Sequence, residues 1–259
     1  WAETLWVRVN SGKPFSSMLQ YPAKLSIWPS LFLFLLFVWV ENVYVDSVIP
    51  SRISQMILFY SGITWLGMFL FGKTVWLRHG EAFSLAFGFL ARFAPTELQP
   101  IRDCPTSRVG EQDRLHSFES QDGPEQTEFY LRPFGSGLIN IEAISTSQML
   151  FVLLLLATVT FDGFTATLPW LNIQASVREI LPSVTLVTTL GLISSGFIFV
   201  VIYLSACQLM RRISRINLRV LDLGKAFVYT LIPIALAYHV AHFLVFLLVQ
   251  GQLILPLAS

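Results

Sequence analysis

Long apolar stretches dominate this chain and limit what it can fold into. Five of them approach the length of about 20 residues that a helix needs to cross the hydrocarbon core of a bilayer. They cover residues 28–45, 53–72, 147–168, 184–210 and 226–255. Charged residues make up only 13% of the chain, about half the share of a soluble domain. We therefore predict an all-α fold, a polytopic integral membrane bundle with about five transmembrane helices.

Two further segments complete the expected organisation. Residues 81–93 are apolar and aromatic but only about half a span long, which favours a short interfacial or re-entrant helix. Residues 96–146 are polar, with mixed charge and scattered Pro and Gly, and indicate an irregular loop. The expected parts are residues 1–95 with two spans and the short helix, the loop 96–146, and residues 147–259 with three spans.

Positive charge predicts the orientation of these spans. Lys and Arg gather before the first span, after the second, and between the fourth and fifth, whereas the other two short connections carry one Arg each. Because basic residues are enriched on the cytoplasmic side, we expect a cytoplasmic N-terminus and a C-terminus on the outer side of the membrane. The chain begins at Trp1 rather than Met, as a processed or partial sequence would. The net charge of +1 provides no basic field for nucleic acid.

Two histidines three residues apart, His239 and His242, lie within the last apolar stretch. This spacing places both on one side of a helix, and Gln250 returns to nearly the same side. Ionisable groups inside a membrane span are costly and usually mark a functional site. The pair is the strongest candidate for a chemical centre in the sequence.

Two carboxylates are expected near the depth of this pair. At about 1.5 Å per residue from the cytoplasmic ends of the spans, His239 lies about 20 Å deep and His242 about 24 Å. The same count places Asp162 about 22 Å deep and Glu41 about 20 Å deep. Four polar side chains from three helices are therefore predicted at one level.

Imidazoles with carboxylates are common ligands of zinc, iron, manganese and copper, and helical bundles build metal sites in this way. We therefore predict a divalent transition metal held by His239, His242, Asp162 and Glu41. Two other interpretations remain open. The histidines could form structural hydrogen bonds between helices, or the cluster could relay protons or polar ligands without a metal.

Other polar positions carry weaker signals. Glu81 precedes the short apolar helix, where a carboxylate suits the first turn; a second site at His79 and Glu81 is the alternative. Cys104 and Cys207 are expected on the reducing cytoplasmic side, where a disulfide is not favoured. The sequence has no Gly-x-Ser-x-Gly, P-loop, His-Glu-x-x-His or Cys-x-x-Cys-His motif.

Several motifs together resemble a family of bacterial polytopic membrane proteins that are commonly described as fenitrothion hydrolases. They are Gly80-Glu-Ala-Phe83, Tyr130-Leu-Arg-Pro-Phe-Gly-Ser-Gly137, Phe161-Asp-Gly-Phe164, Tyr238-His-Val-Ala-His242 and Gln250-Gly-Gln252. The resemblance extends over nearly the whole chain, and proteins of that family are longer at the N-terminus.

This resemblance implies hydrolysis of organophosphate-type esters, which a metal-activated water could perform. The implied roles are His239 and His242 as ligands, Asp162 as ligand or base, and Glu41 as a supporting acid. We therefore expect a metal-binding protein of the bacterial inner (cytoplasmic) membrane with hydrolase activity and a periplasmic C-terminus. The alternatives are a non-catalytic accessory subunit of a larger membrane protein complex, and a proton or small-molecule pathway.

Overall fold

The computed structural model describes residues 18–100, 127–139 and 144–253. The chain divides into two compact units. One unit comprises Trp1–Ala91 and Ile141–Ser259, and the other comprises Arg92–Asn140. All of the apolar stretches that the sequence singles out as spans belong to the first unit.

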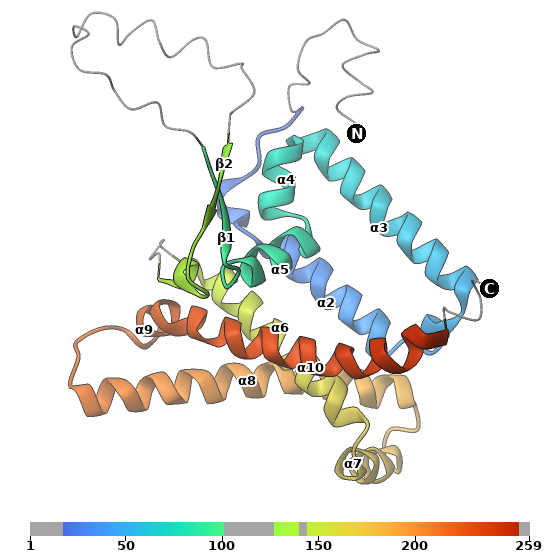
Figure 1. The fold of residues 1–259 in the computed structure, drawn as a ribbon. Helices are drawn as coiled ribbons and strands as arrows, with labels where there is room; N and C mark the ends of the chain where they lie inside the picture. Colours follow the sequence, from blue (N-terminus) through green and yellow to red (C-terminus); the bar gives the residue numbers. More distant parts are fainter. Residues whose placement is uncertain (1–17, 101–126, 140–143, 254–259) are drawn as a thin grey trace, which may run out of the picture. The chain divides into compact units, whose positions relative to one another are not determined.

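The described part of the first unit is helical (Figure 1). Its α-helices are α2 (Trp28–Asn42), α3 (Pro50–Phe71), α4 (Lys73–His79), α5 (Ala82–Ala91), α6 (Thr146–Thr165), α7 (Leu168–Arg178), α8 (Val184–Ser214), α9 (Val220–Phe227) and α10 (Ile232–Gln250). Short 3-10 turns occur at η1 (Ala23–Leu25), η2 (Val45–Val48), η4 (Val228–Leu231) and η5 (Gly251–Leu253).

Four helical segments are long and apolar enough to cross a membrane, counted over the described residues. They are α3, α6, α8 and the continuous segment Val220–Val249 formed by α9, η4 and α10. Large apolar side chains project outward from these segments, as with Leu58 at 71% and Phe197 at 68% exposure. Such a surface is suited to lipid rather than to water. The protein is thus a multi-pass membrane protein with the all-α bundle that the sequence predicts.

The first predicted span, residues 28–45, is shorter than expected. Helix α2 has 15 residues and is about 22 Å long. It ends at Asn42, whose side-chain amide donates to the Val38 carbonyl at 3.0 Å. The turn η2 follows, and Ile49 is extended because Pro50 begins α3. The apolar composition continues through this turn although the helix does not.

Helix α6 forms the centre of the first unit. It begins with a capping box, in which Ser145 and Gln148 each bond the other's backbone N–H. Most of its side chains are buried, and it packs against α2, α8 and α10. Phe151 lies 5.1 Å from Phe34 and 5.6 Å from Phe89, measured between ring centroids. This central helix carries Asp162 near its C-terminal end.

A tight turn joins α3 to α4. Gly72 has a φ of 85°, a conformation that glycine adopts without the steric penalty of a side chain. The turn brings the indole of Trp76 against Gly67, where a methyl group would overlap the ring. Gly80 contacts the same indole. The two glycines leave a slot for Trp76, so α3 and α4 pack closely.

The last predicted span is not one straight helix. Residues Val228–Leu231 form the 3-10 turn η4 between α9 and α10. Pro233 lies in the first turn of α10 and has no N–H to bond to the carbonyl of Tyr229 four residues earlier. The proline therefore accounts for the change of helix type at this point.

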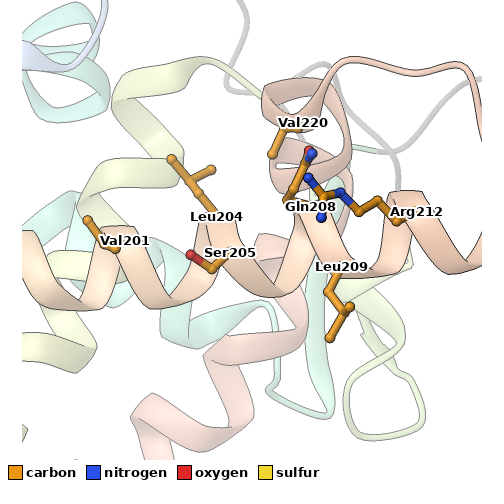
Figure 2. Close-up of a pocket in the computed structure, with 7 residues that line it drawn as sticks. All are labelled: Val201, Leu204, Ser205, Gln208, Leu209, Arg212 and Val220. Atoms are coloured by element: carbon orange, nitrogen blue, oxygen red, sulfur yellow. The ribbon is translucent and has the colours of Figure 1, made fainter.

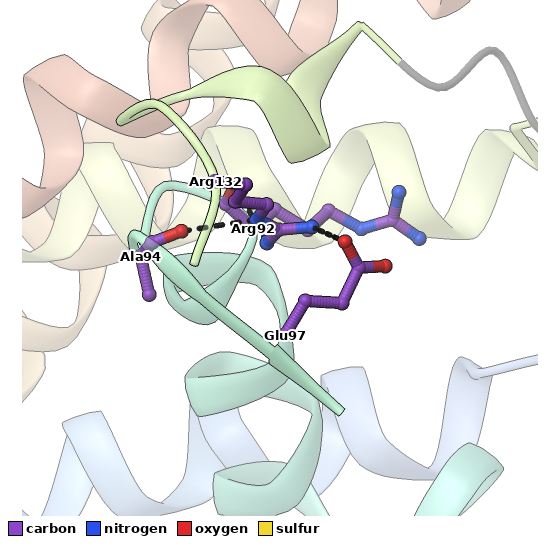
Figure 3. Close-up of polar contacts among 4 residues, drawn as sticks. All are labelled: Arg92, Ala94, Glu97 and Arg132. Atoms are coloured by element: carbon purple, nitrogen blue, oxygen red, sulfur yellow. Dashed lines mark hydrogen bonds and ion pairs between the residues drawn. The ribbon is translucent and has the colours of Figure 1, made fainter. Parts of the chain in front are cut away.

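The second unit contains an antiparallel hairpin rather than only irregular loop. Strand β1 (Thr96–Pro100) pairs with β2 (Thr127–Leu131) in the register Thr96 to Leu131, and the 3-10 turn η3 (Ser136–Leu138) follows. Beside it, the Arg132 guanidinium donates to Glu97 at 2.9 Å and to the Ala94 carbonyl at 3.1 Å (Figure 3). The interpretation of this segment as irregular is wrong for these two strands.

Candidate functional site

Two of the predicted site residues are in direct contact. Nε2 of His242 on α10 lies 2.6 Å from Oδ2 of Asp162 on α6. Both side chains are 37% exposed, so the pair lies at the edge of the helix packing and not in the dry core. At this distance the imidazole N–H donates a hydrogen bond to the carboxylate.

Glu41 approaches the same pair from a third helix. It lies in the last turn of α2, and its carboxylate is close enough to interact electrostatically with both Asp162 and His242. Its side chain is exposed. Three of the four predicted residues, from α2, α6 and α10, are therefore neighbours. The structure groups two carboxylates around one imidazole.

His239 lies one helical turn before His242 and has a different local partner. Its Nδ1 is 2.7 Å from the carbonyl of Ala235. A carbonyl only accepts, so Nδ1 donates its hydrogen and the neutral ring presents Nε2 as an acceptor. The ring lies 6.3 Å from that of Phe243, centroid to centroid. The side chain of Gln250 lies outside the described part of the chain.

A groove opens beside the contact between Asp162 and His242. It has a volume of about 480 Å³ and lies between α6 and α10. Its lining is Val159, Thr160, Gly163, Phe164, Thr167, Tyr238, Ala241 and His242. Besides His242, its polar members are Thr160, Thr167 and Tyr238, none of which the sequence singled out. Tyr238 lies four residues before His242, so helical spacing could have indicated it.

The metal expectation is not tested by this arrangement. Within the described residues, no three His, Cys, Asp or Glu side chains are arranged to hold a metal ion. Asp162 and His242 meet each other directly, whereas ligands of one ion would surround a common point. Metal binding at these residues therefore stays a prediction.

Glu81 occupies the other position that the sequence singles out. Its buried carboxylate accepts hydrogen bonds from the backbone N–H groups of Phe83 and Ser84 and from the hydroxyl of Tyr60. Burial by itself raises the pKa of Glu81, but the hydrogen bonds from Ser84, Tyr60 and Phe83 outweigh it and hold the pKa below its ordinary value. The predicted cap of the short helix is confirmed. Nothing in the sequence indicated the partner Tyr60, 21 residues earlier.

No family model, no curated protein and no solved structure matches this chain. Cys207 is buried as a free thiol, and Cys104 lies outside the described residues.

Proposed function

We propose that this membrane protein uses the pair of His242 and Asp162, with Glu41 beside it, to bind and pass on protons within its apolar helices. The observation that carries the proposal is the 2.6 Å contact between the imidazole and the carboxylate at the edge of the groove. Imidazole changes its charge near neutral pH. Carboxylates and histidines within membrane spans commonly form proton relays. The protein would then belong to a proton pathway, alone or coupled to a small polar molecule in the groove.

The arrangement supports each step that such a role requires. Partial exposure of both side chains gives water or a ligand access to the hydrogen-bonded pair. Glu41 lies within electrostatic range of both residues and provides a second carboxylate for the pathway, to which water or a ligand would have to carry the proton. Tyr238 in the groove provides a hydroxyl group for a chain of hydrogen bonds, whereas the hydroxyl of Thr160 already donates to the Leu156 carbonyl. The resemblance in its sequence supports a bacterial inner membrane, and its basic connections support an N-terminus in the cytoplasm.

Proton flux into sealed vesicles tests the proposal. The purified protein is reconstituted into liposomes with an entrapped pH-sensitive dye, and a pH gradient is imposed with a potassium ionophore present. We expect wild-type vesicles to acidify faster than protein-free vesicles. Asp162→Asn and His242→Gln should slow this flux by roughly tenfold or more, as for loss of a proton-transfer group. His79→Gln, a histidine outside the centre, is the matched control and should behave as wild type.

An equal flux in wild type, both variants and protein-free vesicles would contradict the proposal. A loss of proton flux in His79→Gln equal to that in His242→Gln would show a general effect of replacing a histidine and would also contradict the proposal. Circular dichroism and size-exclusion profiles of each variant establish that its helices and its dispersity are retained. The proposal therefore does not depend on a variant that fails to fold.

Metal binding with hydrolysis of organophosphate-type esters is the second candidate. The tautomer of His239 favours it, because a donating Nδ1 leaves Nε2 with the lone pair that a metal requires. The resemblance in the sequence points the same way. Metal analysis of purified protein should give about one divalent ion per chain, lost from the double variant His239→Ala, His242→Ala. Metal-free wild type with intact folding would eliminate this candidate. Co-purification with other membrane subunits in mild detergent would instead support an accessory role.

A further inference from the structure

A second groove is lined by residues of α8 and α9 and shares no residue with the proposed proton site. It has a volume of about 520 Å³ and is formed by α8 and the start of α9 (Figure 2). Its lining is Val201, Leu204, Ser205, Gln208, Leu209, Arg212 and Val220. Six of these residues follow each other at helical spacing on α8, so they form one side of that helix.

The length of α8 places this groove across the membrane surface. The helix has 31 residues and is about 46 Å long, compared with a hydrocarbon core of about 30 Å. Counted from Val184, Val201 lies about 25 Å along the helix and Arg212 about 42 Å along it. The groove therefore begins among acyl chains and ends at the level of lipid headgroups.

The chemistry of the lining changes in the same direction. Val201 and Leu204 make the deeper part apolar, whereas Gln208 and Arg212 occupy the end towards the headgroups. The side-chain oxygen of Gln208 is buried and accepts no hydrogen bond from any residue in the described part of the chain. A buried acceptor without a donor is unfavourable. Because Gln208 lines the groove, a rotation of its side chain into the groove brings this oxygen to a donor on a bound ligand.

Charge and packing narrow the identity of the ligand. Residues 211–225 hold five basic side chains, Arg211, Arg212, Arg215, Arg219 and Lys225, and one acidic side chain, Asp222. This local net charge of +4 favours an anionic partner. The wall formed by α9 is fixed, because the hydroxyl of Tyr203 on α8 donates to the Gly224 carbonyl at 2.6 Å.

We propose that this groove binds one anionic glycerophospholipid that has hydroxyl groups on its headgroup. Arg212 meets the lipid phosphate through charge-assisted hydrogen bonds. A hydroxyl group of the headgroup donates a hydrogen bond to the side-chain oxygen of Gln208, and an acyl chain lies along Leu204 and Val201. The site is independent of the proposed proton pathway, since it shares no residue with it.

Native mass spectrometry of the full chain in neutral detergent tests the site. The protein is titrated separately with phosphatidylglycerol, phosphatidylethanolamine and phosphatidylcholine. We expect one phosphatidylglycerol per chain to bind more tightly than either zwitterionic lipid. Arg212→Gln should weaken that binding about tenfold, as for a lost direct phosphate contact. Arg211→Gln removes the same charge one residue away, outside the lining, and should weaken it by less than about threefold.

Gln208→Leu separates a lipid contact from a role in packing. If the amide oxygen serves the lipid, this variant loses its preference for phosphatidylglycerol and is at least as stable as wild type in lipid-free detergent. Unchanged lipid preference with lower stability would overturn the proposal. Equal effects of Arg211→Gln and Arg212→Gln would also overturn it, because they would show attraction to the basic segment without a site. Tighter binding of phosphatidylethanolamine would show that an ammonium group is the donor and would refute the anionic lipid.

Discussion

Replacing Glu81 with glutamine should destabilise the protein without emptying the space that the side chain fills. Glu81 is 6% exposed and accepts three hydrogen bonds, two from the first backbone N–H groups of α5 and one from the hydroxyl of Tyr60 on α3. A glutamine keeps one acceptor oxygen of the same reach, but it loses the negative charge. The substitution therefore isolates the contribution of the charge.

The magnitude follows from the number and kind of these bonds. Hydrogen bonds to charged groups contribute about 1.5–3 kcal/mol each, against about 1 kcal/mol for neutral pairs, and a helix cap contributes about 1 kcal/mol. We expect Glu81→Gln to lower the free energy of unfolding by about 2 kcal/mol. Glu81→Ala should lower it by about 3–4 kcal/mol, because all three donors lose their partner.

Equilibrium unfolding in mixed detergent micelles, followed by tryptophan fluorescence, measures these differences. A double-mutant cycle with Tyr60→Phe should give a coupling energy of about 1–2 kcal/mol between the two side chains. Glu179→Gln, an exposed carboxylate at the end of α7, is the matched control and should change stability by less than about 0.5 kcal/mol. A loss for Glu81→Gln no larger than the control, or a coupling energy of zero, would refute the reasoning.

The pH dependence provides a second test of the same contact. The pKa of Glu81 in the folded protein lies below its ordinary value of 4.5, so the unfolded chain binds this proton more readily. The contribution to stability is complete above the unfolded pKa and is lost as the pH falls through the folded pKa. Wild type should therefore lose more stability than Glu81→Gln on acidification. Parallel pH profiles would contradict this expectation.

Two further predictions concern packing and the hairpin. Gly67→Ala should lower the free energy of unfolding by about 1–3 kcal/mol, since its methyl group would overlap Trp76. Gly62→Ala is the control and should not destabilise the protein, because no described atom lies within 4 Å of the added carbon. Equal shifts of the melting temperature in the two variants would contradict the close packing of Trp76 against Gly67. Arg132→Lys should speed hydrogen exchange of the β1 and β2 amides by about tenfold, because lysine cannot reproduce the forked contacts to Glu97 and the nearby carbonyl; unchanged exchange would show that the guanidinium is not required.

Hydropathy was sufficient for the helices that face lipid. The expected stretches 53–72 and 184–210 match α3 and α8 closely, because a continuous apolar surface and backbone satisfaction in lipid both require a helix. Hydropathy did not predict where the helices end. The stretch 28–45 stops as a helix at Asn42, and the helix α7 was not expected after Thr167, although Pro169 in its first turn is a starting signal.

The candidate site was predictable in its members but not in its geometry. Counting residues along each span placed Asp162 and His242 at one depth, and the structure shows them in contact. Depth alone does not give the rotation of each helix about its axis. It therefore could not show that Glu41 approaches this pair, or that Nδ1 of His239 bonds to Ala235. Rotation depends on packing, such as that of Phe161 and Gly191 against Trp170.

The contact between Asp162 and His242 also bears on how the chain is made. Asp162 is the only acidic residue in α6, and its partner is 80 residues later in the chain. At a synthesis rate of about 5–20 residues per second, roughly 4–16 s separate the synthesis of Asp162 from that of His242. A carboxylate within an apolar helix is costly to expose to lipid, and during that interval Asp162 lacks its partner. The contact between Asp162 and His242 therefore requires that α10 be inserted before the finished bundle is released into the bilayer.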